Sequence, residues 1–370
     1  MHVVQGVSLR WYNACANYAV SLAEGLHRIG TRSTVVGVDG SPAIEHALSG
    51  SCDIHALAGA TRGNPLVFLR HVRECRSFAL DSSVDCVNVH NGSDHVLWAL
   101  ALKGMGIPII KTYGNQIPPN AHHGARLLME KTAKVIATCK TAQCFFIDRF
   151  SIPPEDIPVI NGGIDTERYV PVGDDGGVRD RLGIPRDAFV FGLLARFSPD
   201  KGHCHFFRAA GLAAQRFDDV RFIIAGWKSQ YSLEDMKRMA RDAGVADRTV
   251  FAGREPDGRN LISALDVGVI ASVGSETICR IGMEYLAMKK PVIATDTNVV
   301  PEVILHGETG IVVPAGDFRS MAAAMIRMRD DTEFAQTCAA ASRERAESEY
   351  SLESFARKTL DVYRSVINGG

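Results

Sequence analysis

Two glutamates, Glu276 and Glu284, stand eight residues apart in the run from Ser272 to Asp296. A strand-like segment (266–272) precedes them and another (291–296) follows. At 3.6 residues per turn, this spacing predicts one helix with both carboxylates near one face, about two turns apart. The unpaired N–H groups at the start of such a helix favour an anion. A sugar nucleotide matches this combination, because it carries both hydroxyls and phosphates.

Two cations form a second candidate site. Arg196 and Lys201 bracket a turn in LLARFSPDKGH, directly after an apolar strand-like segment (188–195). Arg offers a planar fork of donors and Lys a compact charge, so the pair could clamp a diphosphate without a metal. Surface charge on a loop is the alternative interpretation.

The run with the two acids resembles the signature of retaining glycosyltransferases of family 4, which have the GT-B fold. The resemblance rests on several pieces in order: a serine-containing approach, Glu276, Glu284, a strand PVIATD, Pro301-Glu302, and HGETGIVVP (306–314). It implies that Glu276 holds hydroxyls of the donor sugar and that Glu284 holds the ribose of the nucleotide. It also implies transfer with retention of configuration.

The resemblance assigns the diphosphate to Arg196 and Lys201, which follow the first strand of the second domain. These cations and nearby helix-start N–H groups would stabilise the charge that develops on the leaving diphosphate. Glu276, Arg196 and Lys201 are therefore the predicted catalytic residues. The residues expected to bind the nucleotide sugar are Arg196, Lys201, Arg254, Glu276, Thr277, Ile278, Cys279 and Glu284. For the base, Arg254 or Glu255 lies at the pocket rim, or either is a solvated loop residue.

We expect no metal and no cofactor beyond the nucleotide-sugar donor. The chain has no D-x-D pair of the kind that holds a divalent cation in the other major glycosyltransferase fold, and His122 and His123 have no third ligand at metal spacing. UDP is the favoured nucleotide on family grounds, with GDP and ADP left open. A retaining glycosidase needs carboxylates about 5 Å apart. Eight residues of helix separate them by about 12 Å, which argues against that class.

The N-terminal half is expected to bind the acceptor, and there the sequence departs from the family pattern. The usual glycine pair of the first loop is reduced to Gly6, and Tyr113 stands near where many relatives carry a histidine. The candidate acceptor-side residues are Gly6, Arg10, Asn13, His90, Asn91, Tyr113 and Asn115. Trp11 and Tyr12 either line this site or pack the first helix.

Two further positions have open interpretations. His90 and Asp94 either orient the acceptor or belong to a helix start capped by Asn91, Ser93 or Asp94, and the cap is the simpler reading. Arg280 stands between the two acids, where relatives usually have apolar residues. It either contacts an acidic group of donor or acceptor, or pairs with a neighbouring acid.

Strand-like and helix-like runs alternate along the whole chain, which predicts an α/β fold with parallel sheets. The first series of expected strands is 2–5, 33–38, 84–90, 107–114, 134–139 and 157–162, and the second is 188–195, 219–226, 248–253, 266–272, 291–296 and 309–314. Helices are expected over 13–29, from about Asp94, and from about Phe318 to the end. The segment between Asp39 and Asp81 gives mixed signals.

The two series predict two Rossmann-like domains whose parallel sheets face each other across a cleft, the GT-B arrangement. A Gly- and Asp-rich stretch (161–177) is the candidate linker. We therefore expect an acceptor-binding domain over 1–165 and a nucleotide-sugar domain over 166–350. The family implies that the last helix (351–370) crosses back to the first domain.

Composition limits the remaining possibilities. The 370 residues exceed the usual size of one core, and a formal net charge of −1 gives no global attraction to nucleic acid. No apolar run reaches the length of a membrane span and the N-terminus lacks a signal-peptide pattern. Nine scattered cysteines without a C-x-x-C pair fit a reducing compartment. We expect a cytoplasmic protein, with contact at the inner membrane face and the oligomeric state left open.

The sequence thus favours transfer of a sugar from a nucleotide sugar to a growing surface glycan, a lipid-linked sugar or a small metabolite, as in polysaccharide biosynthesis. Two alternatives remain. A nucleotide-sugar epimerase would need no acceptor and would convert the donor alone. A catalytically silent sugar-nucleotide-binding partner would bind the donor without turnover.

Overall fold

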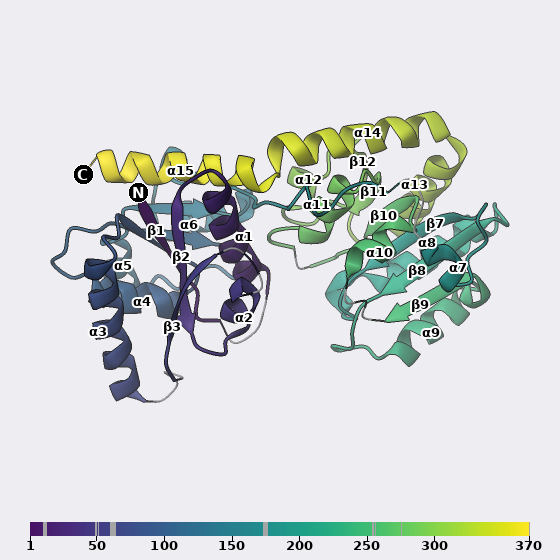
Figure 1. Ribbon diagram of the computed structural model, residues 1–370. Coiled ribbons are helices and arrows are strands. Elements are labelled where there is room, and N and C mark those ends of the chain that lie inside the picture. Colours follow the sequence, from purple (N-terminus) through teal and green to yellow (C-terminus); the bar gives the residue numbers. More distant parts are fainter. Residues whose placement is uncertain are drawn as a thin grey trace. The chain divides into compact units, whose positions relative to one another are not determined.

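Strands and helices alternate along both halves of the chain (Figure 1). The computed structural model describes residues 1–9, 13–48, 50, 52–59, 64–172, 177–253, 255, 257–274 and 276–369. The chain divides into two compact units, one formed by Met1–Asp165 with Tyr350–Gly370 and the other by Thr166–Glu349. The predictions for Arg10, Trp11, Tyr12 and Arg254 lie outside the described residues.

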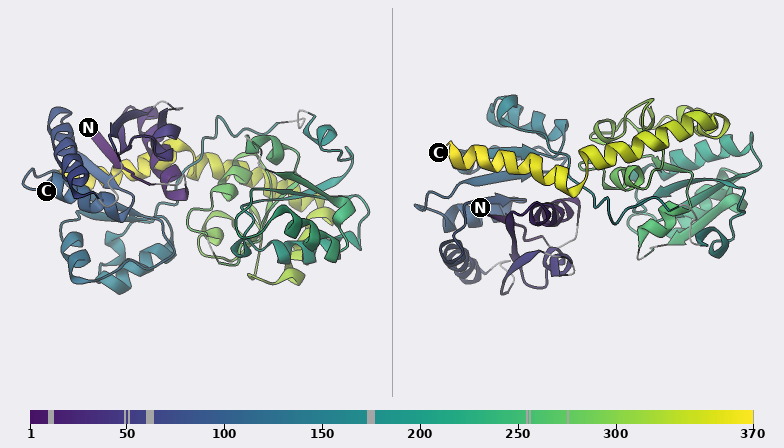
Figure 2. Two further views of the ribbon diagram at one scale, coloured as in Figure 1. Left: turned by 90° about the horizontal axis from the view of Figure 1, so that it is seen from below. Right: turned by 45° about the horizontal axis from the view of Figure 1, so that its top comes forward.

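The first unit is built on a six-stranded parallel sheet with the order β3-β2-β1-β4-β5-β6. Its strands are β1 (His2–Gly6), β2 (Arg32–Val38), β3 (Asp53–Leu57), β4 (Cys86–Val89), β5 (Ile109–Tyr113) and β6 (Lys134–Ala137). Its helices are α1 (Ala14–Arg28), α2 (Pro42–Leu48), α3 (Pro65–Asp81), α4 (Gly92–Ala101), α5 (His123–Met129), α6 (Lys140–Phe150), the short 3-10 helix η1 (Pro154–Asp156) and α15 (Leu352–Asn368). Because helices cover both faces, the central strands are buried along their length (Figure 2).

The second unit repeats this plan with the order β12-β11-β10-β7-β8-β9. Its strands are β7 (Phe189–Leu194), β8 (Val220–Ala225), β9 (Thr249–Gly253), β10 (Val267–Ile270), β11 (Val292–Thr295) and β12 (Gly310–Val313). Its helices are α7 (Val178–Arg181), α8 (His203–Ala214), α9 (Leu233–Asp242), α10 (Gly258–Ser263), α11 (Arg280–Ala287), α12 (Val300–Val303), α13 (Phe318–Asp330) and α14 (Thr332–Glu349), with 3-10 turns η2 (Pro199–Lys201) and η3 (Ala246–Arg248). Phe191, Phe206 and Phe222 form the centre of its core between β7, β8 and α8.

The predicted alternation of strands and helices is confirmed, with two parallel sheets flanked by helices. One predicted strand is wrong. The segment 157–162 makes only an isolated bridge between Val159 and Ala137 of β6. The Ala137 amide donates to Pro158 and the Ile160 amide to Ala137, and no further ladder forms beside them among the described residues. Pro158 cannot donate to a ladder and two glycines follow, so the apolar run does not extend the sheet.

The last helix belongs to the first unit. Residues of α15 pack against α1, where Gly25 allows close approach to the Leu352 carbonyl. Arg28 of α1 also contacts Glu353 at 3.3 Å and Asp165 at 2.6 Å. Further along, the Tyr363 hydroxyl reaches the side chains of two sheet residues. The end of the chain therefore contributes to the core of the first unit.

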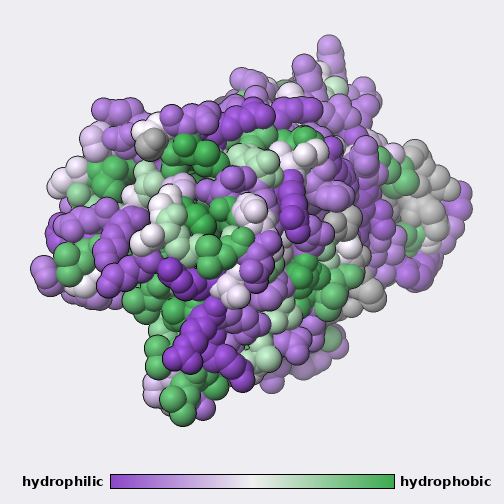
Figure 3. All heavy atoms as spheres, turned by 60° about the vertical axis from the view of Figure 1, so that its left-hand side comes forward, coloured by the Kyte–Doolittle hydropathy of each residue, from purple (hydrophilic) through white to green (hydrophobic). Residues whose placement is uncertain are grey.

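The surface carries apolar groups that are broken into patches. Figure 3 shows one face on which green apolar patches are bordered by purple polar residues. Large exposed apolar side chains include Leu66, Leu69 and Leu80 of α3. Within the described residues, no helix combines the length and the apolar character needed to span a bilayer.

Candidate functional site

The residues with candidate chemistry in the second unit follow the two strands at which the strand order reverses. From β7 the order runs through β8 and β9 in one direction, and from β10 through β11 and β12 in the other. Arg196 and Lys201 follow β7, and Glu276 follows β10. Loops that leave adjacent parallel strands at such a point diverge and form the usual ligand site of open α/β sheets.

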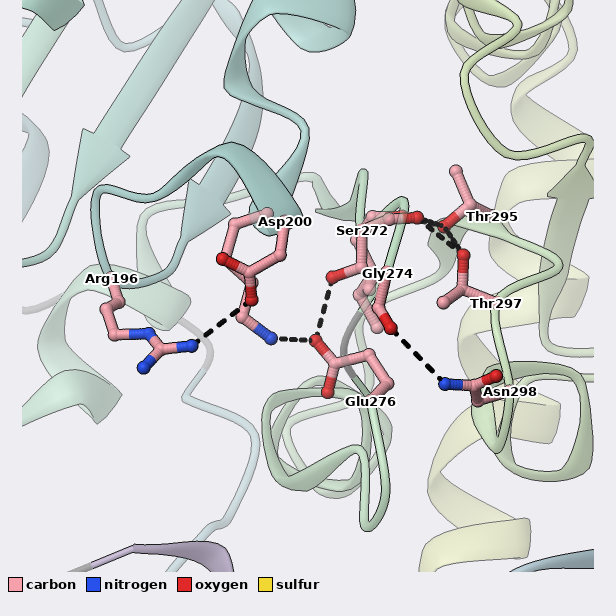
Figure 4. Close-up of polar contacts among 10 residues, drawn as sticks. Arg196, Asp200, Ser272, Gly274, Glu276, Thr295, Thr297 and Asn298 are labelled. Carbon is pink, nitrogen blue, oxygen red and sulfur yellow. Dashed lines mark hydrogen bonds and ion pairs between the residues drawn. The ribbon is translucent and has the colours of Figure 1, made fainter. Parts of the chain in front are cut away.

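The structure brings the predicted cation loop and the first glutamate into direct contact (Figure 4). The ammonium of Lys201 forms an ion pair with Oε1 of Glu276, and the Ser272 hydroxyl donates to the same oxygen at 2.8 Å. The Lys201 and Glu276 side chains are mostly buried, at 15% and 12% exposure. Arg196 is more open and contacts Asp200 at 3.1 Å. Both cations of the clamp therefore have a carboxylate partner.

Backbone contacts hold the two loops together. The Val273 amide donates to the Asp200 carbonyl at 2.8 Å, which joins the loop after β10 to η2. The hydroxyls of Thr295 and Thr297, at the end of β11, donate to the Ser272 carbonyl at 2.5 and 2.6 Å (Figure 4). The position of Glu276 is thus fixed from three neighbouring strands.

The prediction that both glutamates lie on one helix is wrong. Helix α11 begins at Arg280, so Glu276, Thr277 and Ile278 precede it. Cys279 stands before the helix in the left-handed conformation, with φ 54° and ψ 46°, which an α-helix cannot continue. The helical rise therefore says nothing about the separation of the two acids. The first amides of α11 still have no partner inside the helix and lie next to the Glu276 loop.

The Cys279 side chain is buried. Burial, together with the Glu276 charge, raises the pKa of its thiol well above the usual range. The thiolate that would react is therefore scarce at neutral pH. The residue fills space beside Gly282, where even a Cβ would lie 2.6 Å from the sulfur.

Glu284 lies on α11 and has its own partners. Its Oε1 accepts from the Arg280 Nε at 2.8 Å and from the Tyr169 hydroxyl at 3.2 Å. Arg280 thus pairs with a neighbouring acid, one of its two predicted interpretations. Tyr169 was not predicted, because it stands 115 positions away in the glycine-rich stretch after the first sheet and no motif marks it. Glu255, the other candidate for the base, contacts Arg181 at 3.6 Å.

Four of the acceptor-side candidates, Gly6, Asn13, His90 and Asn91, stand at the end of β1 or β4 or after it, and the strand order of the first sheet reverses between these two strands. Gly6 ends β1, and its lack of a side chain admits Trp98 of α4, since a Cβ would lie 2.7 Å from the indole nitrogen. The Asn13 side chain caps α1 by accepting from Ala16 at 3.0 Å. Asn91 caps α4 in the same way, accepting from the Asp94 amide at 2.8 Å. These contacts favour the capping interpretation.

His90 is buried in a polar network under α15 and not open at the sheet edge. Its Nε2 bonds the side-chain Oε1 of Gln5 at 2.9 Å, and the Tyr363 hydroxyl accepts from the Gln5 side chain at 3.3 Å and from the Asn88 side chain at 2.8 Å. Burial, with a smaller effect of the Lys111 charge, lowers the pKa of His90 to about 3. The imidazole is therefore neutral at physiological pH and serves as a hydrogen-bonding core residue.

A second buried cluster was only partly anticipated. Asp94 accepts from the Ser8 amide at 2.6 Å, which ties the loop after β1 to α4. Burial raises the pKa of Asp94 despite that bond and the nearby Lys111 charge. Lys111 contacts the His95 Nδ1 at 3.3 Å, and burial lowers its pKa to about 8. The Asp94 carboxylate of α4 thus holds Ser8 of the loop after β1, with the opposite charge of Lys111 nearby in β5.

The remaining candidates lie apart from these clusters. The Tyr113 ring packs on Phe146 and its hydroxyl donates to the Ile117 carbonyl at 2.5 Å, while Asn115 is exposed. His122 caps α5 through its Nδ1, which accepts from Ala125 at 3.2 Å. In the described part of the chain, no three His, Cys, Asp or Glu side chains are grouped as metal ligands.

Two family models match the chain. The model for glycosyl transferases group 1 matches residues 188–331, and the model for glycosyltransferase family 4 matches residues 15–168. The first match covers the loops of Arg196, Lys201, Glu276 and Glu284, and the second covers most of the first sheet.

Known proteins agree with these matches. The chain is 30% identical to an alpha-maltose-1-phosphate synthase from Mycolicibacterium smegmatis, over 58% of each protein, so the match spans less than two thirds of that relative. It is 28% identical to the lipopolysaccharide core biosynthesis mannosyltransferase LpsB of Rhizobium meliloti, over 71% of this chain and 74% of LpsB. The structure of Anabaena Alr3699/HepE in complex with UDP superposes with a TM-score of 0.82 at 18% identity, covering 99% and 100% of the two chains. The predicted GT-B fold class is thereby confirmed.

Proposed function

Because this chain belongs to glycosyltransferase family 4, we propose that it transfers a sugar from a nucleotide-sugar donor to an acceptor hydroxyl, with a UDP-sugar as the favoured donor. The observation that carries the proposal is the joined pair of loops after β7 and β10, in which Lys201 and Ser272 hold Glu276. Two similar proteins are consistent with the proposal: LpsB is described as a mannosyltransferase, and HepE was solved in complex with UDP.

In the proposed complex, the diphosphate lies against Arg196, Lys201 and the first amides of α11. Lys201 and Arg196 are held in the site before the donor binds, since each has a carboxylate partner. Cleavage of the sugar–phosphate bond moves negative charge onto the diphosphate, and preorganised donors stabilise that charge. When the diphosphate takes over Lys201, Glu276 becomes available to sugar hydroxyls.

Glu284 is the proposed ribose ligand, and the transfer is proposed to retain the anomeric configuration without a metal. The cations of the loop after β7 take the place that a divalent ion would have beside the diphosphate. The acceptor is proposed to bind at the carboxyl edge of β1 and β4 in the first unit. A glycan, a lipid-linked sugar and a small hydroxylated metabolite are the acceptor classes to test, in that order. A cytoplasmic location is part of the proposal.

The experiment that tests the donor assignment is a thermal-shift screen of UDP, GDP, ADP and their common sugar conjugates, with and without EDTA. A ligand at about 100 times its Kd adds roughly 2.7 kcal/mol of stability, which such a screen resolves. We expect a selective shift with UDP ligands that EDTA does not change. Loss of binding or turnover with EDTA, restored by manganese, would contradict the metal-free clamp.

Product analysis separates the transferase from the other two classes. With a UDP-sugar and a pool of acceptors, a transferase releases UDP and forms a glycoside. A new sugar nucleotide from the donor alone would instead identify an epimerase. Tight donor binding without any turnover would identify a silent binding partner.

A further inference from the structure

The two oxygens of the Glu284 carboxylate have different hydrogen-bond partners. The Arg280 Nε–H and the Tyr169 hydroxyl both donate to Oε1, at 2.8 and 3.2 Å. Within the described residues, no hydrogen bond or ion pair reaches Oε2. Since each carboxylate oxygen accepts about two hydrogen bonds, Oε1 is saturated and Oε2 keeps two acceptor positions. Two neighbouring hydroxyls of a ribose would fill those two positions.

We propose that Arg280 and Tyr169 are positioning residues that saturate one oxygen of Glu284 and present the other to the ribose diol of the nucleotide. The inference rests on the proposed function, because it assumes that Glu284 is the ribose ligand. It adds the residues that set the orientation of this ligand and therefore the preference for a nucleotide with both ribose hydroxyls.

The Arg280–Glu284 pair is not explained by helix stability. Arg280 is the first residue of α11 and Glu284 follows it by four positions. A cation at a helix N-terminus opposes the helix dipole, and the order Glu before Lys or Arg is the more stabilising one at this spacing. The sequence thus breaks a local rule next to the ligand site, which is where such departures serve a function.

Tyr169 is held rigidly relative to α11. The guanidinium of Arg343 on α14 donates to the Tyr169 carbonyl at 2.7 Å, to the Ala287 carbonyl at 2.6 Å and to the Thr166 carbonyl at 3.1 Å. One side chain therefore joins the Tyr169 segment to the last residue of α11. Burial, and then the Glu284 charge, raise the pKa of Tyr169 to about 12, so its hydroxyl remains a neutral donor at physiological pH. The Tyr169 hydroxyl therefore keeps its proton and donates it in the hydrogen bond to Glu284.

The test compares two ligands on a set of variants. Calorimetry gives the Kd of UDP and of 2′,3′-dideoxy-UDP for the wild type, Arg280→Leu, Arg280→Lys and Tyr169→Phe. Arg238→Leu on α9 is the matched control, because Arg238 also pairs with an acid on its own helix, Asp235, at 2.9 Å. We expect Arg280→Leu and Tyr169→Phe each to weaken UDP about tenfold, close to the loss of one charge-assisted hydrogen bond.

The expected signature is a change in the ratio of the two affinities. The dideoxy ligand lacks the diol, so its Kd stays the same in all variants, and Arg280→Lys recovers part of the UDP affinity. Unchanged or tighter UDP binding by Arg280→Leu and Tyr169→Phe would overturn the inference, since Arg280 would then only compete with the ribose for Glu284. Equal weakening of both ligands would also overturn it, because a general structural role would explain that result.

Failure of the underlying function gives a different result. If the wild type binds UDP no better than dideoxy-UDP, Glu284 is not a ribose ligand and the donor-site assignment itself is wrong. Tyr169→Phe removes only one hydroxyl, so it provides a folded variant even if Arg280→Leu unfolds the protein. Unfolding curves recorded for every variant separate loss of fold from loss of binding.

Discussion

Gly202 offers a sharp test of how the donor loops are assembled. It stands between Lys201, the last residue of η2, and His203, the first residue of α8, with φ 68° in the left-handed region. A Cβ at this position would lie 1.8 Å from the carbonyl oxygen of Ala271, the residue before Ser272. The absence of a side chain therefore lets the loop after β7 lie on the loop after β10.

The loss of stability expected for Gly202→Ala has two separate causes. The left-handed conformation costs a residue with a Cβ about 1–2 kcal/mol. Replacing Gly244 by Ala has only this conformational cost, because the φ of Gly244 is 71° and no heavy atom lies within 4 Å of the added Cβ. At Gly202 the Cβ must also move away by about 1.5 Å to reach an ordinary carbon–oxygen contact of about 3.3 Å. That shift must displace Lys201 or Ser272 from Glu276.

Thermal unfolding and turnover of the two variants measure these costs. We expect Gly244→Ala to lower the Tm by about 2–8 °C, from 2–4 °C per kcal/mol for a unit of this size, with activity unchanged. Gly202→Ala should lower the Tm by at least twice as much as the control. It should also lower kcat/KM for the donor about 100-fold, since displacements of about 1 Å have that effect in organised sites. Equal Tm changes and unchanged turnover would refute the close contact between the two loops.

Three further predictions concern single residues and pH. Glu276→Ala should lower kcat about 100-fold and donor affinity less than about tenfold, because its contacts strengthen as the sugar–phosphate bond breaks; single-turnover rates and calorimetry check this, and equal losses would mean uniform binding. His90 and His95 both have a folded-state pKa of about 3 because of burial and the Lys111 charge, so the unfolded chain takes up the protons first. The contribution of these histidines to the free energy of unfolding is therefore fully present above the unfolded pKa of 6.5, and it falls by about 2 kcal/mol per histidine between pH 7 and pH 5. A denaturant midpoint that does not change over this pH range would contradict their burial. Lys289→Gly should raise the Tm by about 2–4 °C, because exposed Lys289 stands two residues after the end of α11 with φ 58°; a lower Tm would contradict strain at that position.

The strands of the second unit were predictable because their signal is local. Short apolar runs bounded by turn residues gave β7 to β12 within one or two residues, and the ends of those runs carry Arg196, Lys201 and Glu276. The segment 157–162 failed because its apolar run contains a proline, and only the neighbouring sheet edge decides whether a ladder forms. The start of α11 failed because spacing alone cannot report a left-handed residue such as Cys279.

Side-chain roles in the first unit depended on packing and less on sequence. His90 and Asn91 are polar residues after a strand, a pattern that is typical of ligand sites. The structure uses Asn91 as a helix cap and buries His90 against Gln5, in a network closed by Tyr363 from the other end of the chain. Nothing near His90 in the sequence indicates that α15 covers it.

The sequence by itself determined the alternation of strands and helices, the strands of the second unit, the residue types at their ends, and the family, because periodicity, turn residues and motifs are properties of short segments. The tertiary structure decided which of these residues meet. Lys201 reaches Glu276 because β7 and β10 are neighbours in the sheet, and Tyr169 reaches Glu284 because Arg343 fixes its segment to α11. Contacts between residues 75 and 115 positions apart depend on how whole elements pack, and no local pattern records them.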